Sequence, residues 1–486
     1  MSCAPKYMSD PSRALVLGIG ALTIAGFLLR LFAARGDLWL DEIWSIQNLQ
    51  HIGNVGEIFW GISDDNNHLL NSLWLWIVGP DAPPIIIRLE AIVLGTCTIP
   101  VAAMLCARSG PIAALAGAAL VAGSDLFVHY GSEARGYAGL ILMIFIAAEA
   151  IENYLDDPGD HRSRLVFGLA VAFGALFHLT MLIAAFTLIV ATLARVWLRG
   201  RSPRGVAVAA IALGIPAVLG AVPALGFLLA GVVNTHKIQL GVQVPFTFAR
   251  LGHGLTTVFA AIFGLPYGLP LWLGAGGAVV LTALAVFLLA PERRILPLAC
   301  LLLPPGLACL LRLPNVHIAR FHLIVAVGLV ILFAEAIAKL WSLRQTRLVL
   351  AIGFLVALGN GVHDAELLAL GRGDYERVVA RMEGAGPATY GSNMPAEVGR
   401  TARFYDRRFG GRLAPVSDWC AKPPDWFILS DDPAGETAHR SFGPPRCAAP
   451  FDLDSVMQPA PLSGLRLALY RRTDLAAPLG ANAKPR

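Results

Sequence analysis

The sequence contains few charged residues. Asp, Glu, Lys and Arg make up 15% of its 486 residues, whereas soluble domains carry about 25%. Hydrophobic residues make up 56% and the mean hydropathy is +0.63, so the chain is solvated mainly by lipid and is not an ordinary soluble protein. The net charge of +5 is explained by Arg-rich cytoplasmic loops, so we expect no nucleic-acid partner.

The sequence also lacks the common cofactor motifs. It has seven cysteines but no Cys-x-x-Cys pair and no Cys/His cluster with zinc spacing, and no Gly-rich loop that would cradle nucleotide phosphates. Most cysteines fall in or beside apolar runs, where they are packing residues. Cys420 and Cys447 lie near the C-terminus and could form a disulfide in an oxidising compartment, although their spacing does not decide this.

Apolar runs of spanning length recur between residues 14 and 368. A spanning helix needs about 20 apolar residues, and breaks at charged residues divide the runs into about eleven candidate spans. The first run is longer than a signal-peptide core, so we expect an uncleaved helix. The candidate spans lie near residues 14–35, 85–107, 111–128, 136–155, 165–179, 180–198, 205–232, 270–290, 295–312, 320–340 and 348–368.

The distribution of Lys and Arg predicts the orientation. With a cytoplasmic N-terminus, most loop Lys and Arg residues are cytoplasmic, including Arg199 and Arg204, as the positive-inside rule demands. A single helix over 165–198 would place this basic stretch outside, so two helices are favoured there. We therefore expect a multi-pass protein of the bacterial inner membrane with an extracytoplasmic C-terminus.

Two stretches do not read as spans. Residues 36–84 contain no Lys or Arg, and within them Asp41–His51 and His68–Val78 are typical of Trp-rich helices at the membrane interface. Residues 370–486 combine strand-like runs (Ala388–Gly391, Trp426–Leu429, Leu465–Tyr470) with a polar helix (Ala396–Arg408). The predicted fold is therefore mainly α: a polytopic helix bundle (1–369), interfacial helices in its first outer loop, and a small extracytoplasmic α/β domain (370–486).

The first motif that carries chemistry is Leu38-Trp39-Leu40-Asp41-Glu42-Ile43-Trp44, directly after the first span. Two carboxylates between tryptophans at a membrane surface are partly dehydrated, and an Asp there can hold a cation or accept a proton from a hydroxyl. Acidic residues also favour a helix start through the helix dipole. The residues alone leave both interpretations open.

Two further motifs are predicted on the same outer surface. Asp64-Asp65-Asn66-Asn67-His68 offers Asp65 and His68, together with Glu42, as candidate ligands of Mg²⁺ or Mn²⁺, but Asx residues are equally typical of a turn. His129-Tyr130-Gly131-Ser132-Glu133-Ala134-Arg135-Gly136-Tyr137 joins two spans tightly. Arg135 has the planar fork of donors that suits a phosphate, while a Glu133–Arg135 ion pair is the simpler interpretation.

Other candidate cations lie singly near the predicted outer surface. Each of them can bind the headgroup of a membrane lipid, and a lone His at a span end more often makes one structural hydrogen bond. We expect few ionisable groups deep inside the spans, where ion-coupled transporters place them. The candidates for substrate binding are Arg88, His178, Lys237 and Arg320.

The order of these motifs resembles the GT-C glycosyltransferases. Trp39-Leu40-Asp41-Glu42, Asn67-His68-Leu69, Arg88 and the 130–137 turn follow one another as in bacterial proteins like the dolichyl-phosphate-mannose protein mannosyltransferases, with lipid A aminoarabinose transferases as more distant relatives. The resemblance is dense over 14–200 and thins to hydropathy and Ala319-Arg320-Phe321-His322 afterwards. Leu69 stands where relatives often have Pro after the His.

The resemblance implies an inverting transferase that moves a sugar from a polyprenyl-phosphate carrier to an acceptor hydroxyl on the extracytoplasmic face. Asp41 would be the general base, and Glu42 would orient the acceptor or share a divalent cation. Glu133, Arg135 and Tyr137 would belong to the loop that holds the donor or acceptor, with His68 nearby. The acceptor, a protein, a lipid or a polysaccharide, and the sugar stay open.

A flippase or transporter of lipid-linked sugars is the main alternative. It predicts charged residues that line the spans, and tolerance of losing Asp41. An O-antigen ligase or polymerase would rely on a large outer loop between late spans, whereas the 233–269 loop is moderate and weakly charged. The outer-loop position of the motifs favours the transferase.

Overall fold

The chain divides into two compact units. The computed structural model describes residues 12–200, 202–236, 240–384, 386–430, 441–442 and 450–475. One unit, which we call the membrane unit, comprises residues 1–34 and 48–365, and the other, the sheet unit, comprises 35–47 and 366–486. The short segment 35–47 therefore belongs with the C-terminal residues and not with the helices that flank it in sequence.

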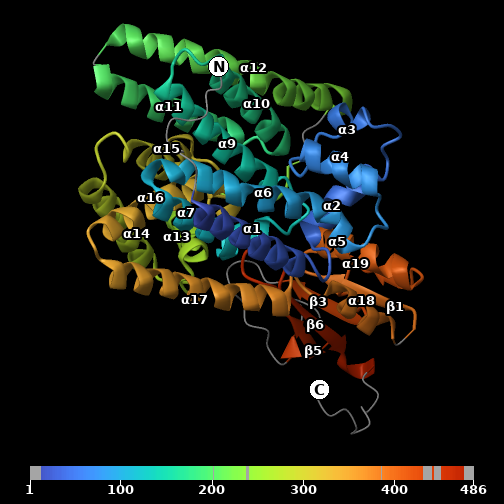
Figure 1. Ribbon diagram of the computed structural model, residues 1–486. Helices are drawn as coiled ribbons and strands as arrows, with labels where there is room; N and C mark the ends of the chain where they lie inside the picture. Colours follow the sequence, from blue (N-terminus) through green and yellow to red (C-terminus); the bar gives the residue numbers. More distant parts are fainter. Residues whose placement is uncertain are drawn as a thin grey trace. The chain divides into compact units, whose positions relative to one another are not determined.

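The membrane unit is built almost entirely of helices (Figure 1). Among the described residues, seven helices (α1, α6, α9, α11, α12, α16 and α17) are long and apolar enough to cross a membrane. The helices of this unit, including α17 and α2, which cross into the sheet unit, are α1 Arg13–Ala33, α2 Leu40–Leu49, α3 Glu57–Trp60, α4 Leu69–Val78, α5 Pro84–Ile87, α6 Leu89–Cys106, η1 Ala107–Ser109, α7 Pro111–Gly123, α8 Asp125–Tyr130, α9 Tyr137–Asp156, α10 His161–Phe177, α11 Met181–Gly200, α12 Pro203–Thr235, α13 Phe248–Phe263, α14 Leu271–Leu288, α15 Ile295–Leu311, η2 Ala319–His322, α16 Leu323–Ser342 and α17 Thr346–Leu370.

The predicted break at 178–180 is confirmed. α10 ends at Phe177 and α11 begins at Met181. His178 is extended (φ −164°, ψ 131°), and its Nδ1 accepts a hydrogen bond from the Thr180 backbone N–H at 3.2 Å. A side chain that satisfies a backbone donor of the next helix is a common device at helix starts.

Two details of the helix pattern were predicted wrongly. The run 111–128 is two helices, because Ser124 is extended (φ −83°, ψ 137°) between α7 and α8. The 233–269 stretch, expected to be a loop, contains α13, whose start is capped by the Thr247 side chain accepting from the Arg250 N–H. With 16 residues, α13 is shorter than the about 20 residues by which spans were recognised.

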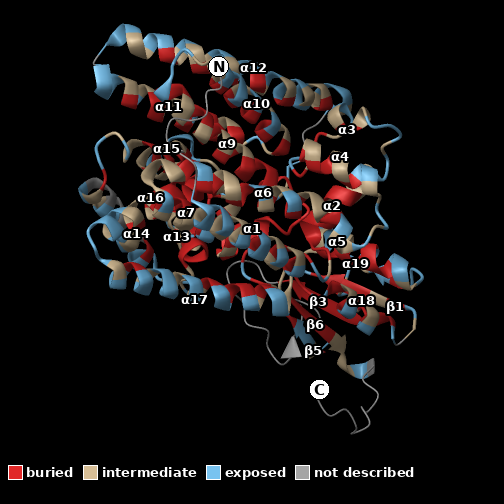
Figure 2. Ribbon diagram, viewed as in Figure 1, coloured by how far each residue is buried: buried red, intermediate tan, exposed pale blue. Residues whose placement is uncertain are grey.

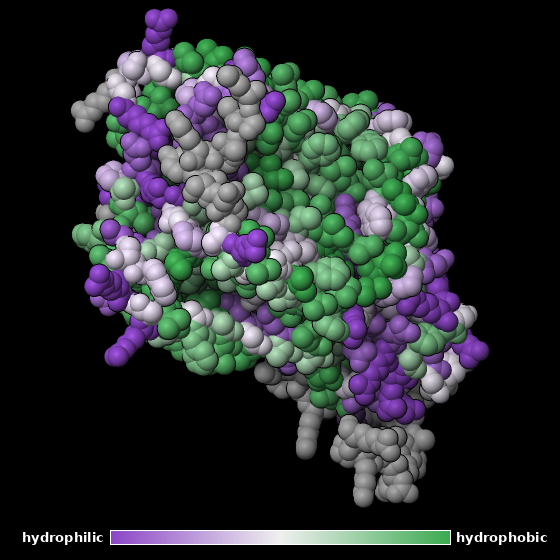
Figure 3. Space-filling view, viewed as in Figure 1, coloured by the Kyte–Doolittle hydropathy of each residue, from purple (hydrophilic) through white to green (hydrophobic). Residues whose placement is uncertain are grey.

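Helix α9 forms the centre of the membrane unit and packs against α6, α10 and α11. In an apolar 18-residue stretch of α9, 72% of the residues are buried, whereas the share is 11% in α1 and 17% in α12, a contrast visible in Figure 2. Large apolar side chains are exposed on α12, among them Val218, Leu219 and Leu229. Figure 3 shows apolar side chains spread over the face of this unit, which is the surface expected of helices that contact lipid.

The sheet unit contains one six-stranded mixed sheet in the order β2-β1-β3-β6-β5-β4. β1 pairs in parallel with β2 and β3, and the other neighbours are antiparallel. α19 packs against α18, β1 and β2. The elements are α18 Tyr375–Glu383, β1 Ala388–Ser392, α19 Pro395–Phe409, β2 Leu413–Pro415, β3 Trp426–Ser430, β4 Ser441–Phe442, β5 Phe451–Met457, β6 Leu467–Arg472 and η3 Thr473–Leu475.

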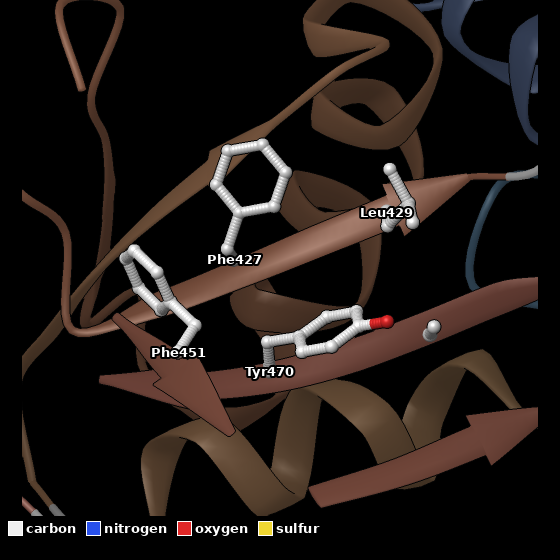
Figure 4. Close-up of a cluster of buried hydrophobic side chains, with 5 residues drawn as sticks. Phe427, Leu429, Phe451 and Tyr470 are labelled. Carbon is white, nitrogen blue, oxygen red and sulfur yellow. The ribbon is translucent and has the colours of Figure 1, made fainter. Parts of the chain in front are cut away.

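The sheet unit has its own hydrophobic core. Phe427, Leu429, Phe451 and Tyr470 pack together on neighbouring strands (Figure 4). The three predicted strands and the predicted helix are confirmed as β1, β3, β6 and α19. Cys420 is disulfide-bonded. Cys447 lies outside the described residues, so the Cys420–Cys447 pairing stays a prediction.

Candidate functional site

Tyr137, the first residue of α9, lies at the centre of a largely buried group of aromatic and cationic side chains. Its ring centroid is 5.2 Å from that of Tyr130, 5.5 Å from His68 and 5.4 Å from His178. The guanidinium of Arg320, from η2, lies 6.0 Å from the same ring. We call His68, Tyr130, Arg135, Tyr137, His178 and Arg320 the Tyr137 cluster. Most of the candidates predicted for substrate binding thus come together in it, from four separate segments of the chain.

Arg135 is held from two sides. Its guanidinium donates to Asn66 Oδ1 and, at 3.1 Å, to the Tyr137 hydroxyl, while the Arg135 side chain is 4% exposed. The Asn66 backbone N–H in turn donates to Asp64 Oδ1 at 2.8 Å. The side-chain amide of Asn66 therefore joins the Asp64–His68 motif to the 129–137 turn. Through this contact the motif holds the Arg135 side chain in place.

His68 is buried as a neutral imidazole. Burial, followed by the charges of Arg135 and His178, lowers the pKa of His68 well below its ordinary 6.5. Its Nδ1 lies 3.0 Å from the Phe177 carbonyl oxygen, which requires the proton to sit on Nδ1. Nε2 then carries a lone pair, and among the described residues it has no hydrogen-bond partner.

The Tyr130 hydroxyl is the second unsatisfied polar group of the cluster. Tyr130 is fully buried, and burial raises the pKa of its phenol well above 10, so it stays a hydrogen-bond donor. Within the described part of the chain this hydroxyl has no partner. An orphaned donor and an orphaned acceptor in a buried cluster are costly unless a ligand or water completes them.

Glycines allow this close packing. A Cβ on Gly136 would lie 2.1 Å from the Phe177 carbonyl oxygen and 3.1 Å from His68 Cβ. A Cβ on Gly131 would lie 2.5 Å from Arg30 Nε. The turn between α8 and α9 can therefore approach α10 and α1 only because these positions lack side chains.

Arg30 braces the turn from α1. Its guanidinium donates to the carbonyls of Gly26, Ala122 and Val121 at 2.8–3.2 Å, and the side chain is fully buried. Arg30 lies in an apolar run and was not among the predicted site residues. The signal in the sequence was a single arginine in the last turn of an apolar run, which indicates a buried and hydrogen-bonded cation.

Glu133 is buried beside a histidine. Its Oε2 lies 3.7 Å from His129 Nε2, and both side chains are at most 1% exposed. The neighbouring Ser132 hydroxyl donates to the Val128 carbonyl at 2.7 Å. The acidic side of the turn is thus anchored on the helix that precedes it, α8.

Asp41 and Glu42 lie in the first turn of α2, within the sheet unit. The Trp39 backbone N–H donates to Glu42 Oε2 at 3.2 Å, which is one half of a capping box. Glu42 is fully buried, and Asp41 is 8% exposed. The helix-start interpretation therefore fits Glu42, whose carboxylate accepts from a backbone N–H at the start of α2. Asp41 is slightly more exposed than Glu42.

The remaining candidates are placed as follows. Arg88 is fully buried and donates to the Ala34 carbonyl at 2.9 Å, so it ties the start of α6 to the end of α1. Asp65 is exposed and accepts from the Gly241 N–H at 2.9 Å. Lys237 lies outside the described residues.

The described residues do not assemble the expected cation site. No three His, Cys, Asp or Glu side chains among them are grouped so that they could hold a metal ion. Glu42 and His68 are each engaged with backbone groups, and Asp65 is held by Gly241. The donors proposed for Mg²⁺ or Mn²⁺ therefore do not fit one ligand set.

Three ionisable side chains near the ends of predicted spans are buried in the protein. Arg30, Asp125 and Asp364 are each at most 6% exposed and come from α1, α8 and α17. Asp125 accepts from the Tyr267 hydroxyl, and its backbone N–H donates to Asn360 Oδ1 at 3.0 Å. The expectation that few ionisable groups lie deep inside the spans stays a prediction.

Comparisons with known proteins bear on the fold. No protein-family model and no curated protein matches the sequence. The structure of the Archaeoglobus fulgidus oligosaccharyltransferase in complex with Zn and sulfate matches 85% of this chain and 68% of its own, at 12% identity and a TM-score of 0.53. The chain shares its fold with an oligosaccharyltransferase. The apo form of the same enzyme matches 84% of this chain and 65% of its own, at 11% identity and a TM-score of 0.50.

The chain spans about two thirds of the oligosaccharyltransferase's length. ArnT from Cupriavidus metallidurans in the apo state matches 96% of this chain and 99% of its own, at 15% identity and a TM-score of 0.39. The expected fold class, a mainly α helix bundle followed by a small C-terminal α/β part, is confirmed.

Proposed function

We propose that the chain is a membrane glycosyltransferase that moves a sugar from a polyprenyl-phosphate carrier to an acceptor hydroxyl, with inversion. The observation that carries the proposal is the Tyr137 cluster. It gathers two guanidinium groups, Arg135 and Arg320, around one tyrosine, and guanidinium groups suit phosphate oxygens.

The cluster also offers partners for a sugar. His68 Nε2 accepts and the Tyr130 hydroxyl donates, and a bound substrate would satisfy both. Aromatic rings on several sides exclude water, which strengthens each polar interaction. We assign the donor phosphate to Arg135 and Arg320, and sugar hydroxyls to His68 and Tyr130, with Tyr137 and His178 as the aromatic walls.

The reaction is a single displacement. Asp41 accepts the proton of the acceptor hydroxyl, and that oxygen forms a bond to the anomeric carbon of the sugar. The bond between the anomeric carbon and the phosphate oxygen breaks, and its electron pair leaves with the polyprenyl phosphate. The leaving group gains one negative charge, which the guanidinium groups stabilise, and displacement from the opposite face inverts the configuration. No step is assigned to a metal ion.

The decisive experiment is transfer by the purified full-length chain in lipid nanodiscs. Radiolabelled polyprenyl-phosphate sugars and a bacterial membrane extract serve as donor and acceptor. We expect Asp41→Asn to lower transfer by about 10²–10⁴-fold, the usual contribution of a general base. Asp81→Asn, an exposed carboxylate in the same loop, is the matched control and should transfer like the wild type.

Equal transfer by the Asp41→Asn and Asp81→Asn variants would remove the catalytic assignment. The buried Arg30, Asp125 and Asp364 favour one second candidate, a flippase of lipid-linked sugars. Movement of the labelled lipid across vesicles without sugar transfer would establish that function instead. Protease protection of a tag after residue 486 would test the extracytoplasmic placement of the C-terminus.

A further inference from the structure

Residues 35–47 are attached to the C-terminal part of the chain by long-range contacts. The Tyr405 hydroxyl, from α19, donates to the Leu38 carbonyl at 2.9 Å. Tyr405 is 1% exposed and Leu38 is fully buried. Leu38 lies two residues before α2, and Asp41 is in the first turn of that helix, so this hydrogen bond fixes the backbone that leads directly to Asp41.

Three further contacts hold the same segment along its length. Asp37 Oδ2 accepts from the Glu376 backbone N–H, at the start of α18, at 2.7 Å. The Arg400 guanidinium lies 4.6 Å above the Trp44 ring. The Gln47 side chain donates to the Arg400 carbonyl at 3.2 Å. The contacts fall on both sides of the Asp41–Glu42 pair, at Asp37 before it and at Trp44 and Gln47 after it.

We propose that the sheet unit is the scaffold of the Asp41 segment, and that Tyr405 and Arg400 are positioning residues for Asp41. The proposal rests on the proposed function for the role of Asp41. Under this proposal α19 positions the general base of the transfer reaction, in addition to any part that the sheet unit plays in acceptor choice.

Position matters here because a general base works only within hydrogen-bond reach of the proton it accepts. A shift of about 1 Å in a reacting group can lower a rate about a hundredfold. Tyr405 and Arg400 do not belong to the cluster assigned to the donor phosphate. Loosening them should therefore lower kcat and leave KM for the donor unchanged.

The test uses the full-length protein in nanodiscs and two measurements. Tyr405→Phe removes one hydroxyl and keeps the ring. Arg400→Gln removes the cation above Trp44, and Arg400→Lys restores a cation. Arg381→Gln is the control, because Arg381 pairs with Asp454 of β5 within the same unit. Hydrogen–deuterium exchange of peptides covering 35–47 measures how firmly this segment is held by the sheet unit. The kinetics of sugar transfer measure whether Asp41 still acts as the general base.

We expect Tyr405→Phe and Arg400→Gln to speed exchange of 35–47 about tenfold and to lower kcat about 10- to 100-fold at unchanged donor KM. Arg400→Lys should recover most of both, and Arg381→Gln should change neither. Unchanged exchange in both variants, or faster exchange at unchanged kcat, would overturn the proposal. If Tyr405→Phe does not fold, the Arg400 pair decides alone.

The outcome is separable from that of the proposed function. If Asp41→Asn transfers normally while exchange of 35–47 responds as expected, the attachment stands and the catalytic role of Asp41 fails. If Asp41→Asn is inactive and the positioning variants behave like the control, the catalytic role stands and the scaffold proposal fails.

Discussion

The close contact between the Arg30 side chain and Gly131 predicts that alanine at position 131 destabilises the protein. Gly131 has φ −80° and ψ 1°, which alanine adopts without strain. An added Cβ would lie 2.5 Å from Arg30 Nε and 2.6 Å from the Phe127 carbonyl oxygen. Gly131→Ala therefore tests a steric contact and not the backbone conformation, and the Phe127 backbone cannot yield as a flexible side chain would.

The magnitude follows from two costs. Overfilling a packed site costs about 1–3 kcal/mol. If Arg30 yields by leaving one of its three carbonyls, a charge-assisted hydrogen bond worth about 1.5–3 kcal/mol is lost as well. We expect Gly131→Ala to lower the free energy of unfolding by about 2.5–6 kcal/mol.

Unfolding of the purified protein in mild detergent, followed by helicity, measures this change. Gly20→Ala is the control, because Gly20 lies in the same helix as Arg30 and its added Cβ meets nothing within 4 Å. It should stabilise by about 0.5–1 kcal/mol. Adding Arg30→Gln to Gly131→Ala should relieve the contact with Arg30, though not the one with the Phe127 carbonyl, so the two substitutions should be non-additive. Additive effects, or a Gly131→Ala variant as stable as the wild type, would refute the steric contact between position 131 and Arg30.

Three further predictions follow from the two units. Arg135→Lys keeps the charge but loses the fork that reaches Asn66 and the Tyr137 hydroxyl, so donor KM should rise about tenfold in initial-rate measurements; an unchanged KM would exclude the phosphate assignment. Because the pKa of His68 lies well below 6.5, unfolding takes up a proton at His68 below that pH, and this residue should lower stability there by up to about 1.4 kcal/mol per pH unit; His68→Gln should remove this residue's contribution to the slope in unfolding curves. Phe451→Ala should destabilise the sheet unit by about 3–5 kcal/mol in thermal unfolding, and a loss below about 1 kcal/mol would contradict the core.

Much of the fold was predictable because the signals are local. Hydropathy marks the long helices, and the positive-inside rule separates α10 from α11 at His178. Short runs of residues that favour strands mark β1, β3 and β6. β5 was missed because it contains Asp452 and Asp454, so its composition resembles that of a loop.

The site was predictable only in part. The order of motifs selected His68, Arg135 and Tyr137 as candidates, because chemistry-bearing residue types stand out locally. That they meet, and that Asn66 supports Arg135, depends on how α9 packs against its neighbours. No local signal reports such packing, since the Asn66–Arg135 contact joins residues 69 positions apart.

The attachment of residues 35–47 changes how the predicted boundary at 369/370 is understood. By composition, residues 370–486 are a separate soluble domain. A boundary at 369/370 implies that residues 1–369 hold the Asp41 segment in place without the C-terminal residues. The Leu38 carbonyl and the Trp44 ring, however, find their partners on α19, more than 350 residues away in the case of Tyr405. A chain ending at 369 would keep every helix from α1 to α16 and still lose the contacts on both sides of Asp41. Under the proposed function, such a chain should bind the donor lipid through the Tyr137 cluster and fail to transfer its sugar.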